Sequence, residues 1–177
     1  MKGYFGEFAY ALGERESGNN YKIVNTLGYV GRWQFGKPRL YDLGYSLDGW
    51  SPPHLDPKII IKRQDFLGDS KLQDKLFRKH IQQHTKYATR HFSDYFGKTI
   101  LGIEVTLSGL VAGMHLKGIG GVRDFLKGEN NKDGYGTEIT EYIEKFGDYD
   151  LIDAKITDED IPTPRGLDLP QGDNEPT

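Results

Sequence analysis

The chain has 177 residues, of which 36% are hydrophobic and 28% are charged, and this composition is typical of one globular domain with a core. It contains no cysteine, which excludes disulfides, thiolate nucleophiles and cysteine-based zinc sites. The net charge of −3 hides two segments of opposite sign: residues 58–98 carry ten Lys or Arg against four Asp or Glu, whereas residues 129–177 carry four against fourteen. The basic segment is either a solvated helix face or a surface that suits a polyanion.

The sequence contains no run that approaches the roughly 18 apolar residues of a membrane helix. Residues 1–18 are interrupted by Glu7, Glu14 and Glu16 and lack the apolar core and cleavage site of a secretory signal. We therefore expect no membrane insertion, and delivery by a route other than general secretion if the protein acts outside the cytoplasm.

The first predicted element is a helix over residues 4–16, because four apolar residues recur there at helical spacing: Phe5, Phe8, Ala9 and Leu12. The run 17–20, Ser-Gly-Asn-Asn, ends it. Residues 21–36 then show two short β-rich runs around a Thr-Leu-Gly turn, which predicts a small, irregular hairpin. Three prolines in residues 49–57 predict a loop.

The second half of the chain favours helices. We predict one over 70–96, with Ser70 after Asp69 as its N-cap and Gly97 at its end, and a buried central helix over 105–116. Glycines at 118, 120 and 121 break the chain before a short helix at 121–127, and a further helix follows at 137–146. Acidic residues and prolines dominate from residue 148. These features predict a domain over 1–147 and a flexible, acidic tail over 148–177.

Glu16 is the first candidate for chemistry. It lies where the first helix runs into the predicted hairpin, and a glutamate at such a place can project into a cleft. Partial burial there raises the pKa of a carboxyl group, as a general acid near neutral pH requires.

Three blocks of residues stand in order along the chain: Glu16-Ser17-Gly18; then Asn25, Gly28-Tyr29 and Gly31-Arg32-Trp33-Gln34-Phe35-Gly36; then residues 109–126. Together they resemble the lysozyme-like superfamily, and most of all its lytic transglycosylases and goose-type lysozymes. The resemblance covers roughly residues 5–146. It implies a mainly α (α+β), lysozyme-like fold, with a helical lobe and a small β-hairpin element after the first helix.

The resemblance also implies a function: cleavage of the β-1,4 bond between N-acetylmuramic acid and N-acetylglucosamine in peptidoglycan. Glu16 is then the general acid and base. The residues expected to contact the glycan strand are Ser17, Tyr21, Asn25, Tyr29, Trp33, Gln34, His115 and Tyr135. Two of these have an alternative reading, since Trp33 and Tyr29 can equally pack the lobe.

The sequence departs from the family pattern at two places. His115-Leu116 replaces a Tyr-Asn pair, so that His115 either takes over the positioning of the sugar or is a core histidine. Trp33 replaces the usual aliphatic residue or Met before the motif glutamine.

The type of reaction depends on a second carboxylate. Phage-type lysozymes keep an Asp about nine residues after the Glu, and here that place holds Asn25. Asp42, Asp48 and Asp56 remain as candidates, but none lies in a motif. A lytic transglycosylase needs no second carboxylate, so the sequence modestly favours that reaction over hydrolysis.

The setting follows from the substrate. We expect action in the bacterial periplasm or cell wall, as a phage lysin or a secreted toxin, with an immunity protein as a possible partner that fills the cleft. No cofactor, metal or nucleic acid is expected. The alternative is a catalytically silent peptidoglycan-binding module, or a structural module of a phage tail or secretion system.

Overall fold

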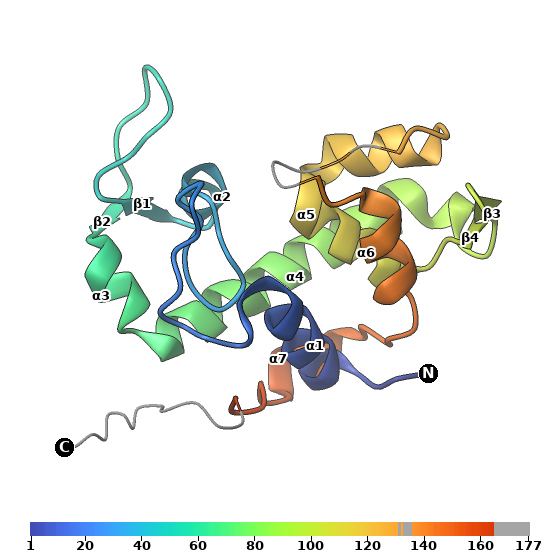
Figure 1. Ribbon diagram of the computed structural model, residues 1–177, viewed down its shortest axis with the longest axis horizontal. Helices are drawn as coiled ribbons and strands as arrows, with labels where there is room; N and C mark the ends of the chain where they lie inside the picture. Colours follow the sequence, from blue (N-terminus) through green and yellow to red (C-terminus); the bar gives the residue numbers. More distant parts are fainter. Residues whose placement is uncertain (131, 133–135, 165–177) are drawn as a thin grey trace. The chain divides into compact units, whose positions relative to one another are not determined.

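The computed structural model describes all residues except 131, 133–135 and 165–177 (Figure 1). Its described part belongs to the α+β class, in which helices hold most of the regular structure and the strands form two small two-stranded sheets. The chain divides into two compact units. We call Met1–Phe8 with Phe77–Asp160 the helical unit, and Ala9–Leu76 with the segment from Ile161 onward the loop unit.

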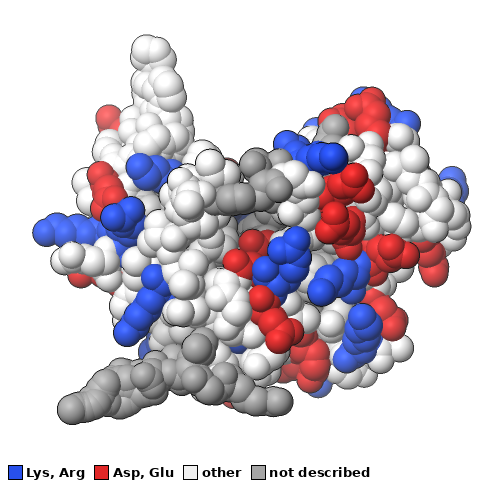
Figure 2. Space-filling model, in the orientation of Figure 1, with Lys and Arg blue, Asp and Glu red and all other residues white. Residues whose placement is uncertain are grey.

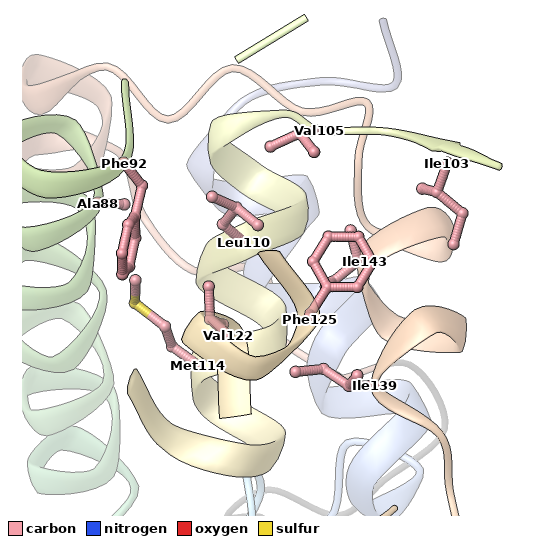
Figure 3. Packing of buried hydrophobic residues seen from close by; sticks show 10 residues of the cluster. All are labelled: Ala88, Phe92, Ile103, Val105, Leu110, Met114, Val122, Phe125, Ile139 and Ile143. Carbon is pink, nitrogen blue, oxygen red and sulfur yellow. The ribbon is translucent and has the colours of Figure 1, made fainter. Parts of the chain in front are cut away.

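Helix α5 (Leu107–Leu126) is the centre of the helical unit, as predicted for a buried helix. Residues 108–114 are all buried, so its first turns are covered all round. Gly109 lets α6 (Ile139–Lys145) approach closely, because a Cβ atom there would lie 2.5 Å from the Ile143 carbonyl oxygen. Figure 3 shows the apolar side chains of both helices packed with those of α4 (Ser70–Phe92).

The predicted glycine break is confirmed at one position inside α5. Gly118 has φ of 74° and ψ of 179°, a combination outside the helical region that only glycine adopts at low cost. The chain returns to helix directly after this residue, so the second helical stretch starts earlier than the predicted residue 121.

Helix α4 confirms the strongest helix prediction with changes at its ends. The N-cap is Asp69 rather than the predicted Ser70, since Asp69 Oδ1 accepts a hydrogen bond from the Leu72 amide at 3.0 Å. At the other end, Ser93–Tyr95 form a 3-10 turn, and Gly97 follows with φ of +86°. The hairpin of β3 (Thr99–Ile100) and β4 (Ile103–Glu104), which was not predicted, follows next.

The segment after residue 147 is packed, contrary to the predicted tail boundary. The Asp150 amide donates to the Gly3 carbonyl at 2.8 Å, and helix α7 (Asp153–Asp158) follows. Ile156 is fully buried, and its carbonyl accepts a hydrogen bond from Arg78 Nε at 2.8 Å. The packed part of the chain therefore extends to at least residue 160, and the remaining tail prediction, over 165–177, lies outside the described residues.

The loop unit begins with the last turns of α1 (Phe5–Ser17), a helix that confirms the predicted span within one residue. The predicted hairpin over 21–36 is present only as isolated antiparallel bridges, Val24 to Val30 and Val30 to Phe35. A regular ladder does not form because the backbone turns repeatedly into the left-handed region, at Gly28, Gly31 and Gln34.

The rest of the loop unit was only partly predicted. Helix α2 (Lys37–Asp42) leads into β1 (Tyr45–Leu47), which pairs in parallel with β2 (Ile59–Ile61). Their connection is the predicted proline-rich loop, seen as a long excursion in Figure 1. Helix α3 (Arg63–Leu67) then precedes α4. No helix in the described part of the chain is long and apolar enough to cross a membrane.

Candidate active site

Glu16 lies in the last turn of α1 and is half-buried, whereas its neighbours Glu14 and Arg15 are exposed. The helix ends just beyond it because Gly18 adopts φ of +68°. The Asn19 amide then donates to the Gly13 carbonyl at 3.0 Å and turns the chain back over the helix end. The expected partial shielding of Glu16 is therefore present.

Ser17, expected to contact substrate, holds the backbone next to Glu16. Its hydroxyl donates to the Arg32 carbonyl at 2.7 Å and accepts a hydrogen bond from the Asn20 amide at 3.0 Å. Both bonds tie the helix end to the loop that follows. The position of Glu16 is thus coupled to the fold of residues 18–36.

Arg32 is the residue that the sequence reasoning missed. Its side chain is fully buried, and each guanidinium nitrogen donates one hydrogen bond: Nε to Asn19 Oδ1 at 2.9 Å, Nη1 to the Tyr21 hydroxyl at 2.8 Å and Nη2 to the Pro162 carbonyl at 2.9 Å. The guanidinium also lies 4.8 Å from the ring centre of Trp33. A buried charge needs hydrogen-bond partners of this kind, and the signal in the sequence is an arginine among apolar and glycine neighbours.

Tyr21, another expected sugar contact, is buried in the same network. Its hydroxyl donates to Asp74 Oδ1 at 2.7 Å while it accepts from Arg32. Burial, and then the charge of Asp74, raise the pKa of Tyr21 well above its usual value of 10.0, although Arg32 acts in the opposite direction. Tyr21 therefore remains a neutral hydroxyl that links the buried cation to a carboxylate.

The motif residues Asn25, Trp33 and Gln34 are also engaged within the loop unit. Asn25 Oδ1 accepts the amides of Leu27 and Tyr29 at 2.9 and 3.0 Å and closes a turn. Trp33 is fully buried and donates from Nε1 to the Ala9 carbonyl at 2.8 Å, and Gln34 Nε2 donates to the Gly31 carbonyl at 2.9 Å.

Trp33 and Tyr29 could each either contact the sugar or pack the lobe, and the structure gives a different answer for each residue. Trp33 packs the core of the loop unit, whereas Tyr29 is 45% exposed. Tyr29 has the exposed ring that stacking on a sugar requires.

His115 belongs to the helical unit and lies on α5 in a histidine cluster. Its Nδ1 is 2.9 Å from His80 Nε2, and the rings of His80 and His84 are 4.5 Å apart. His80 and His84 are buried, whereas His115 is half-buried. Among the described residues, no group of three or more potential ligands is arranged to hold a metal ion. Tyr135 lies outside the described residues.

The candidate second carboxylates are all exposed. Asp48 Oδ1 accepts the Arg63 amide at 2.9 Å at the start of α3, and the Asp56 carbonyl accepts the Tyr41 hydroxyl at 2.9 Å. Asp42 lies beside Arg39 at the end of α2. In the loop unit, a half-buried carboxyl group is found at Glu16 and at Asp74, and the latter already accepts from Tyr21.

The arrangement offers one shielded carboxyl group on a fixed helix end, which suits acid and base catalysis by a single residue. Comparison of the chain with family models, curated proteins and solved structures found no match.

Proposed function

We propose that this protein cleaves the β-1,4 bond between N-acetylmuramic acid and N-acetylglucosamine in peptidoglycan, with Glu16 as its catalytic residue. The observation that carries the proposal is the half-buried position of Glu16 in the last turn of α1, beside the Ser17 bond to Arg32. The three blocks of motif residues supply the substrate class by resemblance.

The position of Glu16 suits a proton donor for two physical reasons. Partial burial disfavours a charged carboxylate relative to the neutral acid. The C-terminal end of a helix also carries partial negative charge, which acts in the same direction. A carboxyl group that keeps its proton near neutral pH can deliver it to the glycosidic oxygen as the bond breaks.

We favour the lytic transglycosylase reaction over hydrolysis. Glu16 gives its proton to the O4 atom of the departing N-acetylglucosamine, and positive charge develops at C1 of the muramic acid. The C6 hydroxyl of that sugar then attacks C1, and the Glu16 carboxylate takes the hydroxyl proton, so that a 1,6-anhydro end forms and the acid is restored. Support comes from Asp42, Asp48 and Asp56, which are exposed, and from Asn25, whose Oδ1 is occupied by its own turn.

A silent binding module is the second candidate, and one observation favours it. Tyr21, Trp33 and Gln34 make hydrogen bonds inside the loop unit. These motif residues can therefore be needed for folding even in a protein without catalytic activity. In both cases the site of action that we propose is the bacterial cell wall, reached through a phage or a secretion system.

The experiment that separates these candidates is digestion of purified sacculi by the wild type and by Glu16→Gln. The amide keeps the shape of the side chain but has no proton of suitable acidity, so we expect loss of soluble muropeptides by a factor of about 10³ or more, at an unchanged melting temperature. Glu14→Gln is the matched control, because Glu14 is exposed on the same helix and should keep nearly full activity.

Two results would contradict the assignment. Full activity of Glu16→Gln would exclude Glu16 as the acid. Binding of the wild type to sacculi without any release of muropeptides would establish the silent module instead.

A further inference from the structure

Helix α4 borders a hollow in the surface of the helical unit, with a volume of about 570 Å³. Residues 83–91 of α4 supply almost all of its lining, and Asp153 at the start of α7 supplies the rest. This hollow is distinct from Glu16, which belongs to the loop unit.

Positive charge outweighs negative charge in the lining of the hollow. Lys86 and Arg90 lie one helical turn apart and are exposed, and neither forms an ion pair within the described part of the chain. Like charges at this spacing repel each other, whereas Arg90, in the last turn, also interacts favourably with the C-terminal end of α4. His91 adds a third basic group, against the single carboxylate of Asp153.

On the face drawn in Figure 2, Lys and Arg side chains are interspersed with Asp and Glu side chains rather than gathered in one basic area. This face therefore carries no broad basic area.

An aromatic platform lies beside the two cations. The ring of Tyr87 is 4.3 Å from the ring of His91, centre to centre. Tyr87 also contacts Arg123, which donates a hydrogen bond to the Tyr87 hydroxyl. The Arg123 guanidinium lies 5.7 Å from the centre of the Tyr87 ring. The ring of Phe92 is a third neighbour, 5.7 Å away centre to centre, so Tyr87 is a fixed aromatic residue in the lining of the hollow, of the kind that packs against sugars.

Thr85 adds a buried polar residue to the lining of the hollow. It lines the hollow with only 5% of its surface exposed, and its Oγ1 has no hydrogen-bond partner within the described part of the chain. Buried hydroxyl groups are nearly always hydrogen-bonded in folded proteins. The Thr85 Oγ1 atom is an exception, and it is itself buried, so it lies behind the surface of the hollow rather than open to it.

We propose that the hollow binds an anionic glycan, a sugar polymer that carries carboxylate or phosphate groups, as a second contact of the protein with the cell wall. Lys86 and Arg90 pair with the anionic groups, and Tyr87 packs against a sugar ring. The inference rests on the proposed function for its substrate class, but it predicts binding rather than cleavage.

The test measures retention of Glu16→Gln protein on purified sacculi, so that cleavage does not consume the ligand. In this background, Lys86→Gln with Arg90→Gln should raise the Kd about tenfold at low salt, because two ion pairs are lost. The matched control is Lys71→Gln with Lys75→Gln, an exposed pair at the same spacing on the same helix, which should change the Kd by less than about twofold.

Three arms identify the ligand. Walls with teichoic acid present phosphates, and sacculi stripped of it present only carboxylates, so dependence on Lys86 and Arg90 in either arm supports the proposal and names the anionic group. Equal effects of the two pairs of substitutions would overturn it. Tighter binding of double-stranded DNA through the same two residues would overturn it in favour of a nucleic acid.

Failure of the two proposals gives different results. If wild-type protein releases no muropeptides but the Lys86 and Arg90 substitutions weaken retention, the proposed function fails and the binding site stands. If cleavage depends on Glu16 but substitution of Lys86 and Arg90 does not change retention on sacculi, only the proposed binding site fails.

Discussion

Arg32 has a buried guanidinium that no carboxylate contacts through a hydrogen bond in the described part of the network. Its three side-chain bonds go to an amide oxygen, a hydroxyl and a backbone carbonyl. Tyr21 passes the interaction on to Asp74. The carbonyl of Arg32 also accepts a hydrogen bond from the Ser17 hydroxyl. The network therefore helps to fix the backbone beside Glu16.

Replacement of Tyr21 by Phe tests the network. The ring stays, but the link between Arg32 and Asp74 is lost, and we expect a loss of about 1–3 kcal/mol in the free energy of unfolding at pH 7. Urea denaturation measures it. Tyr29→Phe, at an exposed ring, is the control and should cost less than about 0.5 kcal/mol.

The same substitution has a predictable dependence on pH. The folded pKa of Tyr21 is raised, so its contribution is complete below the usual value of 10.0. Above that pH the unfolded chain loses the proton while the folded chain keeps it, and wild type loses stability that Tyr21→Phe does not. The difference between the two proteins should therefore shrink as the pH rises past 10.0, and a difference that grows would contradict the buried, neutral hydroxyl.

Among the helices, the break in α5 can be tested with two glycine substitutions that should change the free energy of unfolding in opposite directions. Gly118→Ala forces a Cβ atom onto a backbone that only glycine adopts easily, and should cost about 1–3 kcal/mol although the space is open. Gly120→Ala, at a helical position that is equally open, should stabilise the protein by about 0.5–1 kcal/mol. Melting curves of both variants measure the two effects. Equal shifts of the melting temperature would mean that the backbone at Gly118 is not strained.

Helix α7 gives a second test at this scale. Ile156 is fully buried, so Ile156→Ala should cost about 2–4 kcal/mol in urea denaturation. Ile152→Ala is the control just before the same helix, since Ile152 is 44% exposed and should change stability little. A small effect at Ile156 would restore the original prediction of a flexible tail from residue 148.

Catalysis is a property of the whole molecule, and the products of digestion report its type. If Glu16 works without a second carboxylate, mass spectrometry of the muropeptides should show 1,6-anhydro ends, lighter by one water than hydrolysed sugars. Asp48→Asn should then leave the rate of release within about twofold of wild type, because the side chain serves α3 rather than the reaction. Reducing ends together with a strong loss of activity on replacement of Asp42, Asp48 or Asp56 would establish a hydrolase.

Most of the helices can be predicted from local patterns in the sequence. The spans of α1, α4 and α6, the loop between β1 and β2, and the break at Gly118 were all predicted, because each depends on periodicity, capping or proline and glycine chemistry within a few residues. The sequence also raised the partial shielding of Glu16 as an expectation, and the structure has this residue half-buried.

The roles of side chains in the irregular segments became clear only from the folded chain. Residues 18–36 have no periodicity from which burial can be derived, so the sequence could not separate buried Trp33 and Tyr21 from exposed Tyr29. The packing of residues 148–160 likewise depends on partners far along the chain, such as the bond from the Gly6 amide to Glu159 Oε2 at 2.7 Å. Contacts of this kind form only when distant segments meet in the folded chain, and no local pattern encodes them.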